Sequence, residues 1–244
     1  MTSKKKAGGS ALATTVAALR ADALAHADGE LIGSEDDLVA RHGVSRPTLR
    51  QAAALVAQEQ LLQPKRGVGG GYVARRPTSR AVTHMASIYL QIHGAGLEQI
   101  VQSVEPIRTE LARLAAIFLD DASRAALREY VEREEQRSAE GPSYRAFLRG
   151  EREFGRVIGK ASRNQVLSLF LEILYDLASS LRGQSDLMVG RPERTALYRQ
   201  QRMRIVEAVL EGDADLAVLA SRRCSALGLQ WMLEDAGQEV AAEA

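Results

Sequence analysis

The sequence of residues 29–73 is GELIGSEDDLVARHGVSRPTLRQAAALVAQEQLLQPKRGVGGGYV. Two short amphipathic segments on either side of Gly43 predict two helices joined by a tight turn, because glycine readily adopts the left-handed backbone. Ser34 and Ser45 precede these segments and are expected to cap them, and Pro47 suits a first helical turn. The pattern is typical of a helix-turn-helix.

The second of these helices opens with side chains that suit contact with DNA. Arg46 and Arg50 are four residues apart, so both project from one face of the helix, while Leu49 turns inward. Arginine binds guanine O6 and N7, or phosphate, through two parallel hydrogen bonds. Because the start of a recognition helix meets the base edges, Arg46, Thr48 and Arg50 are candidate DNA contacts.

A glycine-rich loop follows, between two short apolar pairs. Leu61–Leu62 and Tyr72–Val73 are expected to be strands that close residues 65–71 into a hairpin. The run GVGGG within the loop lacks the Lys-Ser/Thr that a nucleotide-binding P-loop requires. The hairpin is therefore interpreted as a structural or DNA-contacting element.

Together these motifs resemble the winged helix-turn-helix of the GntR family of bacterial transcription regulators. The S-E-x-x-L opening, the G-V-S-R-x-T-L-R core and the R-G-x-G-G-G-Y-V wing stand in that family's order and spacing. The resemblance implies that Arg46, Thr48 and Arg50 enter the major groove and that Arg66 and Gly67 of the wing reach the minor groove. Ser45 is included among the candidate DNA contacts, although its role as a helix cap alone explains it. One position departs from the pattern, because many members have arginine where this chain has Asp36.

Composition alone hides this function. The chain has 244 residues and a net charge of +1, which by itself argues against binding nucleic acid. The charge is uneven, however: residues 1–80 hold 12 Lys/Arg and 7 Asp/Glu, whereas residues 81–244 hold 20 and 24. The single cysteine excludes a disulfide framework, and no apolar run is long enough for a membrane span, so a cytoplasmic protein without a membrane partner is expected.

A mainly α fold in two domains is predicted. Residues 1–76 form the winged helix-turn-helix of three helices and a hairpin, residues 77–82 a linker, residues 83–236 an all-α antiparallel bundle, and residues 237–244 a disordered tail. Apolar spacing and Gly/Pro breaks predict further helices besides the two of the helix-turn-helix. They are expected at about 10–27, 82–93, 96–119, 122–139, 143–161, 164–183, 193–211 and 213–235. Pro106 is expected to bend or break its helix.

The helical part resembles the FCD domain, the effector-sensing and dimerising bundle of the FadR-like branch of that family. The resemblance is carried by EREFGRVIGKASRNQVL at 151–167 and RMRIVEAVLEGDADLAVLASRRC at 202–224. Most such domains bind a divalent metal through one Asp and three His, and the matching positions here are Glu151, Gly155, Arg202 and Cys224. Glycine offers no ligand, arginine remains charged, and no histidine lies beyond residue 93, so no metal or other cofactor is expected.

Two roles for Arg202 stay open. Its guanidinium could bind the carboxylate of an effector directly, or it could pair with Glu151 and leave a more apolar cavity. Gly155 would enlarge that cavity, and Cys224 and Trp231, seven residues apart, could line one wall, although Trp231 fits a core or dimer interface as well. Tyr198 completes the candidate pocket for a small organic acid or an acyl-type effector.

These features predict a homodimeric regulator, most often a repressor, that binds a pseudopalindromic DNA operator and responds to a small molecule. A constitutive DNA-binding protein whose helical domain only dimerises is the alternative. Enzymatic activity is not expected, because the helical domain has no histidine beyond residue 93 and its one cysteine has no partner base.

Overall fold

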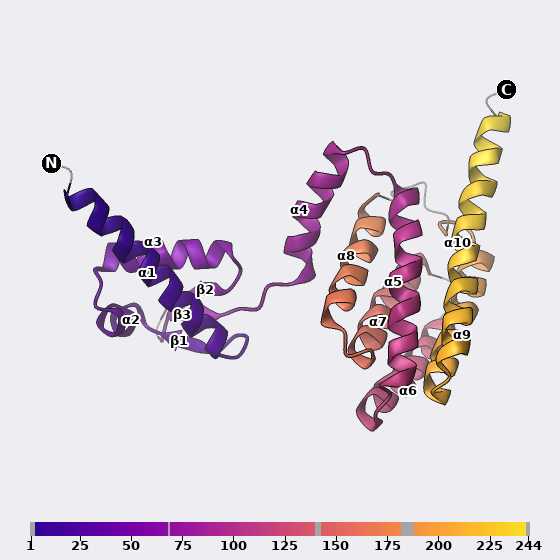
Figure 1. Ribbon diagram of the computed structural model, residues 1–244, viewed down its shortest axis with the longest axis horizontal. Coiled ribbons are helices and arrows are strands. Elements are labelled where there is room, and N and C mark those ends of the chain that lie inside the picture. The colour runs from indigo at the N-terminus through magenta and orange to yellow at the C-terminus, as the bar shows by residue number, and fades with distance from the viewer. Residues whose placement is uncertain (1–2, 68, 140–142, 182–187, 243–244) are drawn as a thin grey trace. The chain divides into compact units, whose positions relative to one another are not determined.

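The computed structural model describes residues 3–67, 69–139, 143–181 and 188–242. The chain divides into two compact units, Met1–Thr78 and Ser79–Ala244. Figure 1 labels the helices and strands of both units. Among the described residues, no helix combines the length and the apolar character needed to cross a membrane.

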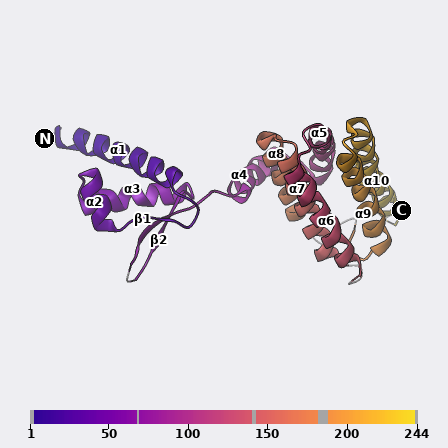
Figure 2. The ribbon, with the colours of Figure 1, turned by 90° about the horizontal axis from the view of Figure 1, so that it is seen from below.

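The first unit contains three helices and a small sheet. The helices are α1 (Ser3–Ala25), α2 (Glu35–His42) and α3 (Arg46–Gln58), and the strands are β1 (Leu31–Gly33), β2 (Leu62–Lys65) and β3 (Gly71–Ala74). The strands are antiparallel in the order β1-β3-β2. Figure 2 shows the β2–β3 hairpin projecting away from the three helices. This arrangement is a winged helix-turn-helix, as the sequence predicts.

Local signals in the sequence set the helix ends of this unit. Ser34 and Asp37 form a reciprocal capping box at the start of α2, and Gly43 ends that helix with φ of 61°. Ser45 caps α3. Strand β1 was not predicted: it has only three residues and pairs irregularly with β3, so it gives no alternating pattern. Buried side chains from α1, α2, α3 and the sheet make one core, which includes Leu19, Ile32, Leu38, Leu49, Val56 and Tyr72.

The second unit is built from helices throughout its described residues. They are α4 (Ser79–Ile92), α5 (Leu97–Ile117), α6 (Asp121–Ala139), α7 (Tyr144–Ala161), α8 (Gln165–Leu181), α9 (Pro192–Glu211) and α10 (Ala214–Ala242). Helix α5 is central, because it contacts α7, α8, α9 and α10. The largest core cluster joins these helices to α6 and includes Leu111, Leu127, Tyr130, Phe154, Leu171, Val209 and Cys224.

Three expectations about this unit are corrected. The break considered at Pro106 is not found: α5 is one helix from Leu97 to Ile117, because its packing against four neighbouring helices outweighs the cost of a proline in a helix, about 3 kcal/mol. Helix α4 begins at Ser79, inside the segment expected to be linker. Helix α10 continues to Ala242, since its last third contains no proline and is rich in Ala and Glu, which favour helix. The expected tail at 237–244 is therefore helical to Ala242, and residues 243–244 lie outside the described residues.

Candidate DNA interface and effector pocket

The recognition helix α3 presents its first turn to solvent. The Oγ of Ser45 accepts a hydrogen bond from the backbone N–H of Thr48 at 3.4 Å, and the two hydroxyls lie 2.9 Å apart. Leu49 is fully buried and fixes the rotation of the helix. As a result the side chains of Arg46 and Arg50 are 59% and 66% exposed. Both arginine side chains that the sequence predicts as DNA contacts are therefore accessible to solvent, and Thr48 between them is partly buried.

The two arginines are held by acidic residues of α2, which the sequence analysis missed. Arg50 Nη2 lies 2.9 Å from Glu35 Oε1, and Arg46 Nη2 lies 2.7 Å from Asp36 Oδ1. The pair with Glu35 raises the pKa of Arg50 further above its ordinary value. The sequence contained a signal for these ion pairs. Acidic residues fill the first turn of α2, and the arginines stand in the first turns of α3, the next helix of the motif. An anion that binds either guanidinium group would therefore have to displace these carboxylates.

The wing tip depends on its glycines. A Cβ on Gly70 would lie 2.5 Å from the carbonyl oxygen of Lys65, so only glycine fits there without moving the hairpin. Gly67 has φ of 97°, a conformation that other residues rarely adopt. Arg66 precedes it, is exposed, and forms no ion pair with any described residue. The charge of Arg66 is thus available at the tip of the wing.

In the helical unit, Arg202 of α9 pairs with carboxylates inside the protein. Its side chain is fully buried, its Nη1 donates to Glu151 Oε1 at 2.6 Å, and its Nη2 donates to Glu134 of α6. The rings of Tyr130 and Phe147 lie beside its guanidinium, with centroids 5.9 and 5.8 Å from Cζ. Of the two roles considered for Arg202, the geometry fits the internal ion pair.

A glycine beside this ion pair makes room for it. A Cβ on Gly150 would lie 2.8 Å from Arg202 Nη2 and would also meet the carboxylate of Glu134. Sequence reasoning did not single out Gly150, although it directly precedes Glu151. A larger side chain at position 150 would therefore push α7 away from Glu134 of α6 and Arg202 of α9.

The four positions that correspond to the family's metal ligands do not offer a metal-binding set. Glu151 is bonded to Arg202, whose fixed positive charge repels a cation. Gly155 does not enlarge a cavity as expected, because the ring of Tyr175 fills the space: a Cβ on Gly155 would lie 2.9 Å from Tyr175 Cε2. Cys224 is fully buried, and burial raises the pKa of its thiol, which disfavours the thiolate that a metal needs. Among the described residues no group of three or more His, Cys, Asp or Glu side chains could hold an ion.

Trp231 belongs to a separate apolar cluster rather than to the ion pair. It packs with Phe147 and Met188 and is 6% exposed, and the guanidinium of Arg194 lies 5.3 Å from its ring centroid. Cys224 lies in the main core, so the two residues do not line a common wall. The surroundings of Trp231 are therefore those of a residue packed in the core of the helical domain.

A second buried arginine, Arg108 of α5, was missed. It is fully buried, and its Nη1 donates to the hydroxyl of Tyr198 at 2.6 Å. Its Nη2 donates to the carbonyl oxygen of Ser221 at 3.3 Å and to the hydroxyl of Ser225. The sequence did contain a signal: Arg108 stands four residues after Val104 and three before Leu111, on the buried stripe of the helix.

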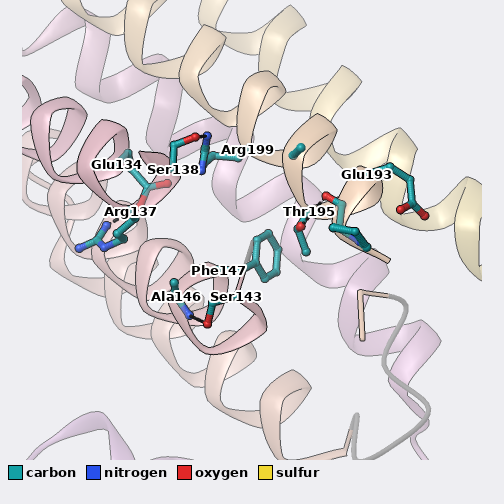
Figure 3. Close-up of a pocket in the computed structure, with 11 residues that line it drawn as sticks. Glu134, Arg137, Ser138, Ser143, Ala146, Phe147, Glu193, Thr195 and Arg199 are labelled. Atoms are coloured by element: carbon teal, nitrogen blue, oxygen red, sulfur yellow. Dashed lines mark hydrogen bonds and ion pairs between the residues drawn. The ribbon is translucent and has the colours of Figure 1, made fainter. Parts of the chain in front are cut away.

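Two pockets lie near these arginines. The larger, about 340 Å³, is formed by α6, α7 and α9, and Figure 3 shows the ring of Phe147 directed into it, with Arg137 and Arg199 at its edge. The smaller, about 40 Å³, also borders Phe147 and is lined by Arg108, Glu151, Tyr175 and Tyr198 among others. Two members of the expected effector pocket, Glu151 and Tyr198, therefore do line a cavity.

The fold and these surfaces define a DNA-binding regulator with a separate helical domain, and comparison with known proteins gives its family. The FCD domain family matches residues 99–226, more than half of the chain. The chain is 27% identical over 197 residues to the HTH-type transcriptional repressor NanR of Salmonella schwarzengrund, covering 78% of this chain and 71% of that protein. The NanR of Cronobacter sakazakii is 27% identical over 200 residues, covering 78% and 72%.

A solved structure agrees in fold. The GntR protein of Streptococcus agalactiae superposes with a TM-score of 0.69 at 16% identity, covering 88% of this chain and 97% of that one. This chain belongs to the GntR family of DNA-binding transcription regulators and carries an FCD domain as its helical domain.

Proposed function

We propose that this protein is an effector-responsive repressor that acts in the cytoplasm as a homodimer on a pseudopalindromic operator. The observation that carries the proposal is the exposure of Arg46 and Arg50 on the capped first turn of α3, beside a wing whose tip presents Arg66. Similarity to proteins named as repressors supports the direction of regulation. A two-fold dimer matches two half-sites one helical turn or more apart.

We propose further that the helical domain senses its effector without a metal and is not an enzyme. Arg202 stands where the family places a histidine ligand, and it is already paired with Glu151 and Glu134. The thiol of Cys224 is buried and has a raised pKa, so it is a poor nucleophile. Effector binding then regulates DNA affinity through a difference in affinity between two states of the dimer, typically 1–3 kcal/mol.

Selection of duplexes from a random DNA pool with the full-length protein tests this proposal. We expect an inverted-repeat site, and we expect Arg46→Ala and Arg50→Ala each to weaken binding to it by about 1–3 kcal/mol. Arg113→Ala on α5 is the matched control, because Arg113 pairs with Glu110 in the helical unit and should leave DNA affinity unchanged. Enrichment of no common sequence, or wild-type affinity in both α3 variants, would overturn the assignment of α3.

A further inference from the structure

Helix α7 carries a continuous basic face on the outside of the helical unit. Every fully exposed residue of this helix is a cation, and the five stand at spacings of four, three, four and four residues: Arg145, Arg149, Arg152, Arg156 and Lys160. With 3.6 residues per turn, they fall within roughly 80° of the helix circumference and extend over about 22 Å of its length. These five residues are called the basic face of α7.

The acidic side chains of α7 do not neutralise this face. Glu151 is buried and bonded to Arg202 of α9. Glu153 pairs with Arg133 and Arg137 of α6. Figure 2 shows α7 between α6 and α8, and it packs against both. Both carboxylates therefore serve contacts with neighbouring helices and not with the cations of the exposed face.

The residues of α8 neutralise only one of the five cations. Arg152 Nη2 lies 3.1 Å from Asp176 Oδ1, with side chains 43% and 26% exposed. Glu172 lines the same small hollow as Arg156 but lies beyond ion-pair distance of it. Within the part of the chain that the structure describes, the other four cations form no ion pair. The basic face of α7 therefore retains four uncompensated positive charges.

This arrangement differs from the other exposed helix faces of the unit, which combine opposite charges. Arg133 pairs with Glu129 on α6, and Arg113 pairs with Glu110 on α5. Such pairs stabilise a helix, whereas like charges three or four residues apart repel each other and destabilise it. Residues 81–244 also hold more acidic than basic residues, 24 against 20. Neither helix stability nor overall composition therefore accounts for the basic face of α7.

The chemistry and length of this face suit the backbone of duplex DNA. Four of its five cations are arginines, whose planar guanidinium groups bind phosphate oxygens through two parallel hydrogen bonds. Each DNA strand carries one phosphate per 3.4 Å of the duplex axis, so a linear stripe of about 22 Å can follow several phosphates. A membrane is a poorer match, because a helix that binds lipid inserts exposed apolar side chains, and the apolar residues of α7 are buried or half-buried.

We propose that the basic face of α7 is a second DNA-binding surface, which binds the phosphate backbone of duplex DNA without reading its sequence. It belongs to the helical unit and is separate from α3 and the wing. Anchoring of the chain at an operator through α3 raises the local concentration of phosphates for this surface. These phosphates belong either to the DNA that flanks the operator or to a separate duplex.

The surface is tested with full-length protein and a labelled mixed-sequence duplex, so that no operator is needed. Arg149→Gln/Arg156→Gln should weaken this binding by about threefold to tenfold at low salt, since it removes two cations from the phosphates. The slope of log K against log salt should fall by about two, because each lost phosphate contact removes about one. Arg149→Lys/Arg156→Lys keeps both charges and should keep the slope. Unchanged affinity and slope in the glutamine variant would overturn the proposal.

Arg204→Gln/Arg223→Gln is the matched control. These two arginines are exposed on α9 and α10 of the same unit and form no ion pair with described residues. The control variant removes the same net charge and should bind the mixed-sequence duplex like the wild type. An equal loss of affinity in both double variants would attribute the effect to net charge and contradict a specific role of α7.

Two further measurements exclude other roles of the face. Thermal unfolding of Arg149→Gln/Arg156→Gln should give an unchanged or higher Tm, because the variant relieves repulsion between exposed like charges. A markedly lower Tm would show that these arginines support the fold instead. Sedimentation with phosphatidylserine vesicles examines the other polyanion: loss of vesicle binding in this variant, with DNA binding unchanged, would assign the face to lipid and refute the proposal.

A selected operator, once available, identifies the source of the phosphates. If flanking DNA supplies them, the wild type should bind an operator with flanks more tightly than the bare operator, and Arg149→Gln/Arg156→Gln should lose this gain. If a separate duplex supplies them, protein on the bare operator should retain a second labelled duplex through the same arginines. If neither occurs, the proposal is wrong. Binding of the mixed-sequence duplex through α7 without selection of any operator would contradict the proposed function and leave this surface intact.

Discussion

Glu151 Oε1 and Arg202 Nη1 lie 2.6 Å apart in the interior of the helical domain, where the matching positions in most FCD domains hold a metal ion. The ion pair joins α7 to α9, and Glu134 extends it to α6. Fixed charges of the protein thus connect helices at the place where a bound cation would otherwise do so. This connection can be tested separately from ligand binding.

Loss of Arg202 alone should be more harmful than loss of Arg202 together with Glu151. Arg202→Met leaves Glu151 buried without its counterion, while Glu134 keeps its pair with Arg137, and should lower the free energy of unfolding by about 3–5 kcal/mol. The double variant Arg202→Met/Glu151→Leu should recover part of this loss, because it removes one unpaired carboxylate. Urea unfolding followed by circular dichroism measures both.

The control for that comparison is an exposed pair. Arg222 and Glu105 lie 3.7 Å apart with side chains 68% and 37% exposed, so Arg222→Met should change the free energy of unfolding by less than about 1 kcal/mol. Equal effects of Arg202→Met and Arg222→Met would show that the buried pair does not hold the helices.

Gly155→Ala should destabilise the protein by about 1–3 kcal/mol. The added methyl group would lie 2.9 Å from Tyr175 Cε2, so one of the two helices must move. Gly228→Ala is the matched control: its methyl group would meet Val101 Cγ1 at an ordinary 4.0 Å, and alanine in a helix is favoured over glycine by about 1 kcal/mol. Thermal unfolding should therefore move in opposite directions for the two variants, and a shift of the same sign in both would contradict the packing of Tyr175 on Gly155.

The parts of this structure that local chemistry determines were predictable from the sequence. Ser34, Gly43 and Ser45 act on their own neighbours, so the ends of α2 and α3 could be inferred without knowledge of the rest of the chain. The exposure of Arg46 and Arg50 followed from those ends.

The long-range features could not be obtained in this way. Tyr175 packs on Gly155 from another helix, and the partners of Arg108 come from α9 and α10, about 90 residues or more away. Pro106 shows the same limitation, because its local cost is overcome by contacts with distant helices. Spacing within one helix indicates which face is buried but not which side chain meets it.

Removal of acidic charge from α2 should strengthen DNA binding. Asp36→Asn removes the shorter ion pair of Arg46, leaving the one with Glu35 at 3.9 Å, and it removes an anion that would lie close to the phosphates, so operator affinity should rise by about twofold to fivefold at low salt. Glu35→Gln should act similarly through Arg50. Anisotropy titrations at two salt concentrations measure the effect, which should shrink at higher salt.

Glu59→Gln provides the comparison for these variants. Glu59 pairs with Arg20 at 2.6 Å in the same unit, so this change removes one acidic charge without releasing a recognition arginine. An increase in affinity as large as that of Asp36→Asn would attribute the effect to net charge rather than to the release of Arg46.

Stability should decrease at alkaline pH. Burial raises the pKa of Tyr130, Tyr175 and Tyr198 above the ordinary 10.0, and burial also raises the pKa of Cys224 above 9.0. The unfolded chain then releases protons that the folded protein retains, so the stabilisation is complete below about pH 9 and is lost as the pH rises above it. Urea unfolding from pH 8 upward should give a falling free energy, and tyrosinate absorbance of the folded protein should lag behind that of the unfolded chain. A free energy of unfolding that stays constant to pH 11 would falsify this assignment.

The ring of Tyr175 against Gly155 also bears on how this domain can change in evolution. A histidine at 155 cannot be accommodated until Tyr175 is replaced, and a ligand at 202 cannot be introduced without leaving the buried carboxylate of Glu151 unpaired. Each of these steps is destabilising when taken alone, and none of them creates a complete metal site. Single neutral substitutions therefore do not lead from this packing to a metal site, because the ring of Tyr175 and the ion pair of Arg202 must both be replaced first.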